Sequence, residues 1–151
     1  MAELKKILLV DDNPEDTELT TIALNGKNLA GRLVVAGDGV EALEYLRYQG
    51  QWANRKPENP AFILLDIKMP RMNGLELLEI IRQDPALAMI PAVMLTSSRE
   101  EQDLRKCYQL GTNAYVVKPV DFKEFITAVG QLGQFWATIN EIPSDDKLVR
   151  H

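Results

Sequence analysis

Polar side chains follow four short apolar runs of the sequence, at the point where each run ends. They are Asp11 and Asp12 after the first run, Asp66 after the third, Thr96 after the fourth and Lys118 after the fifth. Taken singly, each has a plain structural explanation as a helix cap, a turn residue or a solvated lysine. Three carboxylates, one hydroxyl and one ammonium in equivalent positions favour a joint function if the runs are parallel strands.

The chemistry of such a site follows from its charge. Three neighbouring carboxylates cannot all stay ionised without cost, so one must bind a proton or a cation must share the site. Oxygen ligands suit Mg²⁺, and no His or Cys is placed to favour zinc or copper. The ion and Lys118 would neutralise an incoming phosphoryl group, and Thr96 could donate to a phosphoryl oxygen. Asp66 is the best candidate to attack phosphorus, because its strand would border the binding crevice.

The apolar runs themselves are predicted to be five buried strands. Their continuous rather than alternating apolar character is typical of parallel strands that are covered on both faces. The predicted strands are residues 7–10, 33–36, 62–65, 92–95 and 115–117. Segments of helical periodicity lie between them, and the predicted helix starts carry capping residues: Asn13 with Pro14, Asp38 with Glu41, Asn73 with Glu76, Ser98 with Glu101, and Asp121 with Glu124.

This alternation predicts an α/β fold with a doubly wound, five-stranded parallel sheet and helices on both faces. For five strands we expect the flavodoxin-like order 2-1-3-4-5, which opens a crevice between strands 1 and 3 at their carboxyl ends. The last helix has an apolar stripe that is expected to pack on the sheet. The stripe comprises Phe122, Phe125, Ile126, Val129, Leu132 and Trp136.

Length and composition predict one domain with its own core, because the chain has 151 residues of which 46% are hydrophobic and 26% charged. Lys and Arg number 17 against 22 Asp and Glu, giving a net charge of −5 that argues against a nucleic-acid partner. No segment has the pattern of a membrane span or signal peptide, and Cys107 is the single cysteine. We therefore expect a cytoplasmic protein with a reduced thiol.

Two features concern domain organisation. Residues 1–140 are expected to form the domain, and residues 141–151 a mobile C-terminal tail without an output domain. Residues 49–60 are polar, contain Gly50, Pro57 and Pro60, and are interpreted as an extended surface loop carrying Trp52.

Four segments, in the same order, resemble the receiver domains of two-component response regulators: LLVDDNPED, LLDIKMPRMNG, MLTSS and AYVVKPVD. The resemblance covers residues 6–133. It implies that Asp66 accepts a phosphoryl group and that Mg²⁺ is held by Asp11, Asp12, Asp66 and the Lys68 backbone carbonyl. It also implies phosphoryl contact by Lys118, a switch formed by Thr96 and Tyr115, and a cis peptide bond before Pro119.

The same resemblance implies partners. A sensor histidine kinase would supply the phosphoryl group, since His151 is the only histidine of the chain and stands at its end. The output would be changed affinity for a downstream protein, or a homodimer through the fourth helix, fifth strand and fifth helix. The protein would be a signalling switch rather than an enzyme, although it would assist its own phosphorylation and dephosphorylation. The segment VAGDGVEALEYLRYQG and the loop before LLDIKMPRMNG further resemble single-domain regulators paired with phytochromes.

Other functions match part of the sequence. Gly37, Asp38, Gly39 and Ala42 fit a dinucleotide-binding motif, but the motif follows the second strand and Asp38 would repel a pyrophosphate. A Mg²⁺-dependent phosphatase with an aspartyl nucleophile usually needs a second acid where Lys68 stands. A phosphorylation-silent module of the same fold would not need the reactive residues, all of which are present.

Overall fold

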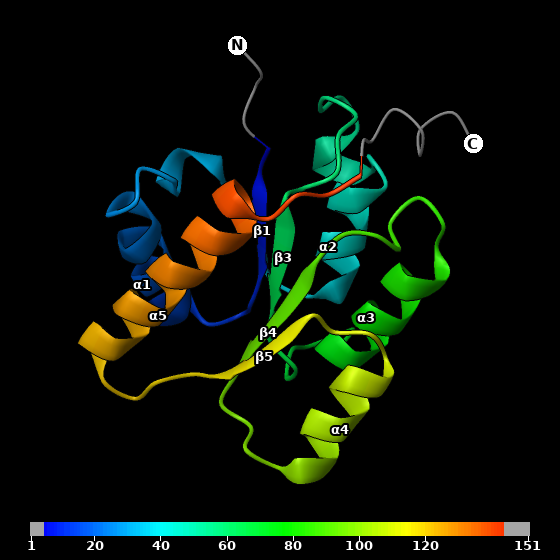
Figure 1. The fold of residues 1–151 in the computed structure, drawn as a ribbon. Coiled ribbons are helices and arrows are strands. Elements are labelled where there is room, and N and C mark those ends of the chain that lie inside the picture. Colours follow the sequence, from blue (N-terminus) through cyan, green and yellow to red (C-terminus); the bar gives the residue numbers. More distant parts are fainter. Residues whose placement is uncertain (1–4, 144–151) are drawn as a thin grey trace.

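The computed structural model describes residues 5–143, in which strands and helices alternate along the chain (Figure 1). The strands are β1 (Ile7–Val10), β2 (Leu33–Ala36), β3 (Phe62–Leu65), β4 (Ala92–Thr96) and β5 (Ala114–Val117). The α-helices are α1 (Pro14–Asn25), α2 (Gly39–Leu46), α3 (Gly74–Gln83), α4 (Glu101–Gln109) and α5 (Phe122–Gln134). Short turns η1 (Ala30–Arg32) and η2 (Gly50–Trp52) and a π-helical turn η3 (Phe135–Ile139) complete the described elements.

All five strands pair in parallel in the order β2-β1-β3-β4-β5, which confirms the predicted fold class. Helices α1 and α5 cover one face of the sheet, and α2, α3 and α4 cover the other (Figure 1). The order places β1 and β3 side by side at the centre, so the residues that follow them meet at the carboxyl edge.

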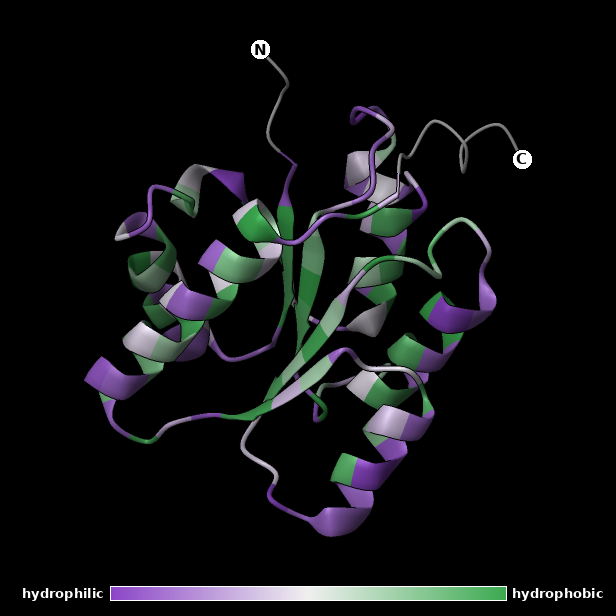
Figure 2. Ribbon diagram, in the orientation of Figure 1, coloured by the Kyte–Doolittle hydropathy of each residue, from purple (hydrophilic) through white to green (hydrophobic). Residues whose placement is uncertain are grey.

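The core consists of two apolar layers, one on each face of the sheet. Leu8 and Ile63 belong to the layer under α2 and α3, whereas Ile7 and Phe62 belong to the layer under α1 and α5. Because neighbouring residues of a strand point to opposite faces, both must be apolar when both faces are covered. This explains the unbroken apolar runs of the central strands, which Figure 2 shows in green.

Side-chain caps begin four of the five α-helices, as predicted. The residues that cap are Asn13, Asp38, Asn73 with its reciprocal partner Glu76, and Asp121. The cap predicted for α4 at Ser98 is wrong, because the N-cap residue is Glu100 and its side chain makes no capping bond. The Ser98 hydroxyl instead donates to Asp103 at 2.6 Å.

The apolar stripe of α5 packs on the sheet along most of its length. Phe125 and Val129 are buried, and Ile126, Leu132 and Trp136 are partly buried against the same layer. Phe122 departs from the prediction, because it stands in the first turn and remains 59% exposed.

The loop between α2 and β3 is folded rather than extended, which corrects the interpretation of residues 49–60. Trp52 packs edge-on against Tyr45, with ring centroids 5.5 Å apart. The Arg55 guanidinium lies 3.9 Å from the Tyr45 ring and 4.3 Å from the Tyr48 ring, and it donates to three backbone carbonyls of this region. Cation–π contacts and hydrogen bonds together hold the loop against α2.

The peptide bond before Pro119 differs from the expectation. The bond between Lys118 and Pro119 is trans, because the described residues contain no cis peptide bond, so the predicted cis bond before Pro119 is wrong. The trans form is intrinsically favoured by about 0.5–1 kcal/mol even before proline.

No helix among residues 5–143 is long and apolar enough to cross a membrane. Most of the predicted tail, residues 144–151, lies outside the described residues.

Candidate functional site

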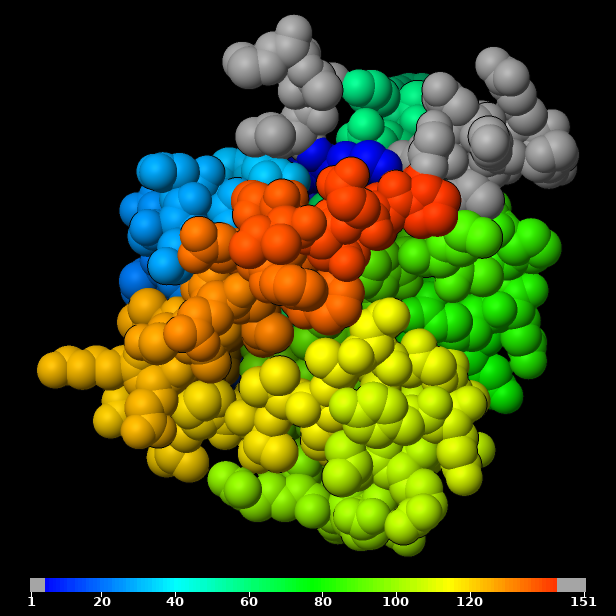
Figure 3. Space-filling view, viewed as in Figure 1, coloured from blue at the N-terminus to red at the C-terminus, as the bar shows by residue number. Residues whose placement is uncertain are grey.

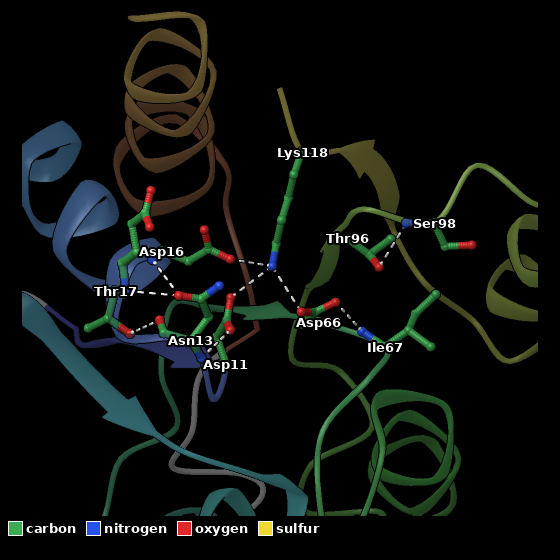
Figure 4. Close-up of polar contacts among 10 residues, drawn as sticks. Asp11, Asn13, Asp16, Thr17, Asp66, Ile67, Thr96, Ser98 and Lys118 are labelled. Atoms are coloured by element: carbon green, nitrogen blue, oxygen red, sulfur yellow. Dashed lines mark hydrogen bonds and ion pairs between the residues drawn. The ribbon is translucent and has the colours of Figure 1, made fainter. Parts of the chain in front are cut away.

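Four charged side chains converge at the carboxyl edge of the sheet (Figure 4). Asp11 follows β1, Asp66 follows β3, and Lys118 reaches across from the end of β5. The Lys118 ammonium lies 3.1 Å from Asp11 Oδ2 and 2.9 Å from Asp66 Oδ2. The structure therefore brings together three of the residues that the sequence placed at the ends of strands.

The fourth member of this cluster, Asp16, was not predicted from the sequence. Its Oδ2 lies 2.6 Å from the Lys118 ammonium, which is shorter than either of the other two distances. Asp16 stands in the first turn of α1, whose cap Asn13 begins the helix directly beside the end of β1. Helical side chains tilt toward the helix N-terminus, so a first-turn residue of α1 can reach back to this edge, but the sequence does not distinguish Asp16 from its acidic neighbour Glu15.

The electrostatics of the cluster follow from three carboxylates sharing one ammonium. Burial raises the pKa of Asp11 to about 6, and hydrogen bonding to Asn13 and attraction to Lys118 only partly offset this effect. Burial alone would lower the pKa of Lys118, but its bonds to Asp16 and Asp66 and the neighbouring negative charges raise it above its ordinary value. Lys118 is therefore charged, and the cluster keeps an excess of carboxylates over cations.

The Asp66 backbone is fixed by close packing at the start of α3. A Cβ on Gly74 would lie 2.1 Å from the Asp66 carbonyl oxygen, so only glycine fits at that position. The Gly74 N–H donates to the Ile67 carbonyl at 2.8 Å, and the Asp66 N–H donates to Val10 at 3.1 Å. The Asp66 Oδ1 accepts from the Ile67 N–H at 2.7 Å. These contacts orient the carboxylate toward Lys118.

Asp12 and Lys68 lie beside the cluster in sequence but have exposed side chains. None of the hydrogen bonds among the described residues joins the Asp12 carboxylate to Asp11, Asp66 or Lys118. Asp12 is thus accessible to solvent, as is required of a ligand that takes up an ion from water.

Thr96 and Tyr115 both contact Ser98, in the loop between β4 and α4. The buried Thr96 hydroxyl accepts from the Ser98 N–H at 3.3 Å, and the Tyr115 hydroxyl donates to the Ser98 carbonyl at 3.0 Å. The two predicted switch residues are therefore linked through one residue that also bonds to Asp103 of α4.

The side chains of the cluster bear on whether a metal ion fits. Within residues 5–143, no group of three or more His, Cys, Asp or Glu side chains is arranged to hold a metal, and the Lys118 ammonium occupies the point where the three aspartates meet. The donors nevertheless suit a hard divalent cation, because they are all oxygens. Burial raises the pKa of Asp11, and the Lys118 ammonium offsets this effect only in part, so a further positive charge beside Asp11 would be favourable. In donor chemistry, therefore, these residues fit such an ion, although three of the carboxylates contact Lys118 in this structure.

The dinucleotide-binding motif is accounted for by packing. Asp38 caps α2 and is paired with Arg71, and a Cβ on Gly39 would lie 2.7 Å from the Met72 side chain. The glycine permits the close approach of a neighbouring loop, not of a pyrophosphate.

A cluster of aspartates and one lysine at the edge of a 2-1-3-4-5 sheet agrees with the family to which this chain belongs. The chain is a member of the response regulator receiver domain family, whose model matches residues 7–130. This is a family of signalling proteins that take phosphoryl groups from sensor histidine kinases and bind Mg²⁺ or Mn²⁺ at the phosphorylation site.

Similar proteins agree with this assignment. Response regulator Rcp1 of Synechocystis is 34% identical over 140 residues, which cover 93% of this chain and 94% of Rcp1. The solved structure of Mn²⁺-bound Rcp1 has a TM-score of 0.84 and covers 93% of this chain and 99% of its own. The phosphorylated cyanobacterial phytochrome response regulator RcpA has a TM-score of 0.86 at 37% identity, covering 94% of this chain and all of RcpA. The bacteriophytochrome response regulator AtBRR is 54% identical with a TM-score of 0.74, covering 93% of this chain and 100% of its own.

Proposed function

We propose that this chain accepts a phosphoryl group on Asp66 from the phosphohistidine of a sensor histidine kinase. The observation that carries the proposal is the position of the Asp66 carboxylate, 2.9 Å from the partly buried Lys118 ammonium at the carboxyl edge of the sheet. An Asp66 oxygen would form a bond to phosphorus while the bond from phosphorus to the kinase imidazole breaks, leaving an acyl phosphate on Asp66. Lys118 would offset the negative charge of the transferred group.

We further propose that the divalent ion is Mg²⁺. Asp11, Asp12, Asp66 and the Lys68 carbonyl would hold it, and the bound ion would supply positive charge to the phosphoryl oxygens. The support is the oxygen-only donor set, the uncompensated charge at Asp11, and the Mn²⁺-bound form of the relative Rcp1. The same charges would assist the later attack of water that removes the phosphoryl group.

The signal would pass from Asp66 to the surface of α4, β5 and α5. Phosphorylation adds about one negative charge and new acceptor oxygens, so the Thr96 hydroxyl would leave the Ser98 N–H and donate to the phosphoryl group. Tyr115 would move into the space that Thr96 vacates. The result would be a changed affinity for a downstream protein or for a second copy of the chain, by a shift between conformations.

The kinase partner is proposed to be a phytochrome, because RcpA and AtBRR are both described as phytochrome response regulators. Residues 1–140 would form the signalling unit. The protein would act in the cytoplasm, where a kinase makes phosphohistidine from ATP.

The proposal is tested by phosphorylation of Asp66→Asn with acetyl phosphate or a phytochrome kinase. The wild type should gain hydroxylamine-sensitive phosphate in the presence of Mg²⁺, and the variant should gain none, because an amide is a poor nucleophile. Asp84→Asn is the matched control, since Asp84 lies at the C-terminal end of α3. Labelling that survives in Asp66→Asn would show that another residue is the acceptor.

A further inference from the structure

The loop that follows Asp66 is tied to the beginning of α2. We name residues 67–73, between β3 and α3, the acceptor loop. Arg71 donates from Nε to Asp38 Oδ2 at 2.7 Å and from Nη2 to Asp38 Oδ1 at 3.1 Å. One residue further on, the Met72 carbonyl accepts from the Gly39 N–H at 3.1 Å. A bidentate ion pair and a backbone hydrogen bond thus join the loop to Asp38 and Gly39, two consecutive residues at the N-terminus of α2.

Asp38 is a rigid anchor for this contact. It is buried, and its Oδ1 also accepts from the Glu41 N–H at 2.9 Å as the cap of α2. Burial opposes ionisation of Asp38, but the bonds from Arg71 and Glu41 outweigh it and hold its pKa below the ordinary value. The carboxylate is therefore charged and fixed by its helix, so Arg71 is positioned by Asp38.

The acceptor loop has a backbone that needs such an anchor. Arg71 has φ of +62°, in the left-handed region that residues other than glycine rarely adopt. A residue held there costs free energy and persists only when its surroundings impose it. The Cβ that Gly39 lacks would lie 2.7 Å from Met72 Cγ, which shows how closely the loop is pressed onto α2.

The acceptor loop also carries the groups that the reaction needs. It begins directly after Asp66 and includes Lys68, and its far end is closed by the bond from Gly74 to Ile67 at 2.8 Å. We propose that Arg71 and Asp38 form a clamp that positions the acceptor loop, and with it the Lys68 carbonyl, for cation binding and phosphoryl transfer. This proposal rests on the proposed function. Arg71 and Asp38 are positioning residues, because neither belongs to the cluster around Lys118.

The test measures Mn²⁺ affinity by electron paramagnetic resonance, and the rate of phosphorylation by acetyl phosphate, in Arg71→Gln and Asp38→Asn. Asparagine caps helices as well as aspartate does, so Asp38→Asn keeps α2 while losing the charge. We expect each variant to lose roughly tenfold in Mn²⁺ affinity and in rate, as is typical when a residue that orients a metal ligand is changed. The double variant should lose no more than either single one, because both changes break one contact.

Two further variants separate positioning from stability. Arg71→Gly removes the clamp but also relieves the positive φ, so it should keep the wild-type melting temperature and still lose Mn²⁺ affinity. Arg47→Gln removes a different arginine–aspartate pair, with Asp84 at 3.2 Å, and should leave affinity and rate unchanged. A clamp that only stabilised the fold would give melting-temperature changes without changes in affinity.

The possible results distinguish the two proposals. Affinities and rates within twofold of wild type in both clamp variants would overturn the clamp while leaving the phosphoacceptor function in place. A wild type that binds Mn²⁺ but takes no phosphate would overturn the proposed function. The clamp would then be tested by the Mn²⁺ affinities alone, with values within twofold of wild type in both clamp variants overturning it. A wild type that neither binds Mn²⁺ nor takes phosphate would overturn both.

Discussion

Asp11 is the residue at which the charge of the site is least well compensated. Burial raises its pKa from 3.8 to about 6, although the Lys118 ammonium lies 3.1 Å away. Lys118 also contacts Asp16 and Asp66, so its positive charge is shared among three carboxylates and lowers the pKa of Asp11 only in part. A second cation beside Asp11 would therefore be stabilised most when that carboxyl is ionised.

The raised pKa of Asp11 predicts a pH-dependent effect of Mg²⁺ on stability. Because the folded pKa exceeds the unfolded value, the proton on Asp11 stabilises the fold below about pH 3.8, and that contribution is lost as pH rises through about 6. The proposed Mg²⁺ would bind the ionised form of Asp11, so its stabilising effect should grow as pH rises through about 6. At a hundredfold excess over Kd the effect should reach about 2.7 kcal/mol. Melting temperatures with and without Mg²⁺, measured on both sides of the Asp11 pKa, check this.

Asp11→Asn is the matched variant for that experiment. It should remove the change in stability that wild type shows near pH 6 without Mg²⁺, and weaken the response to Mg²⁺ at every pH. A Mg²⁺ response of equal size below and above pH 6 in the wild type would contradict the role given to Asp11.

Helix α4 buries the fewest residues of the five α-helices. Its only buried residue is Cys107, whereas each of the other four α-helices buries at least three. Its first turn has no side-chain cap, and the bond from Ser98 to Asp103 is the contact that joins this turn to the preceding loop. A helix with little buried apolar surface opens at low free-energy cost, which suits the proposed response of α4 to phosphorylation.

We therefore predict that Asp103→Ala frays the start of α4. Loss of a bond of the capping kind costs about 1 kcal/mol, so amides in the first turn should exchange with deuterium about fivefold faster. Arg105→Ala is the control in the same helix, because its exposed pair with Glu101 contributes little. Hydrogen exchange followed by mass spectrometry measures both. Equal exchange in Asp103→Ala and wild type would show that Ser98 does not hold the helix.

The elements that could be predicted from the sequence are those specified by local pattern. The five strands follow from unbroken apolar runs, and four helix starts follow from caps that bond within three residues. The α4 cap was wrong because the Ser98 hydroxyl donates to the Asp103 side chain and accepts from the N–H of Glu100, the residue before the helix, rather than from an N–H in its first turn. The folded loop was missed because Arg55 is held by stacking on Tyr45 and Tyr48, a contact between side chains that capping and turn patterns do not describe.

The same distinction applies to the candidate site. Asp11, Asp66 and Lys118 meet because they end parallel strands, which the topology alone determines. Asp16 joins them only because of the angle at which α1 leaves β1, and the Arg71–Asp38 pair depends on how a loop folds over a neighbouring helix. Strand order could therefore be predicted with its site, whereas contacts that depend on helix and loop placement could not.

At the scale of the whole molecule, α4, β5 and α5 together flank one of the two edges of the sheet. Strand β5 is the last of the sheet and pairs only with β4 among the described residues. Figure 3 views the molecule from this side, with β5 and α4 in yellow to yellow-green and α5 in orange. A groove of about 360 Å³ runs between β5 and the end of α5, lined by Val116, Ala128, Gln131, Leu132, Phe135 and Trp136. The apolar lining and the free strand edge are suited to a protein partner.

This surface is predicted to mediate dimerisation when the protein is phosphorylated. Beryllofluoride with Mg²⁺, a mimic of the phosphoryl group, should move the wild type toward a dimer in size-exclusion chromatography, because the proposed movements of Tyr115 and α4 would reshape the surface beside the groove. Phe135→Ser should abolish this change while still being stabilised thermally by beryllofluoride, since Phe135 is 44% exposed, lines the groove from η3 and does not belong to the cluster around Lys118. Ile22→Ser, which removes a 48% exposed side chain from α1, should dimerise as wild type does. A dimer across α4, β5 and α5 must bury the Phe135 ring and leave Ile22 in solvent. Unchanged elution of the wild type would therefore exclude this surface as the site of output. A response that is abolished in Ile22→Ser but kept in Phe135→Ser would exclude it as well.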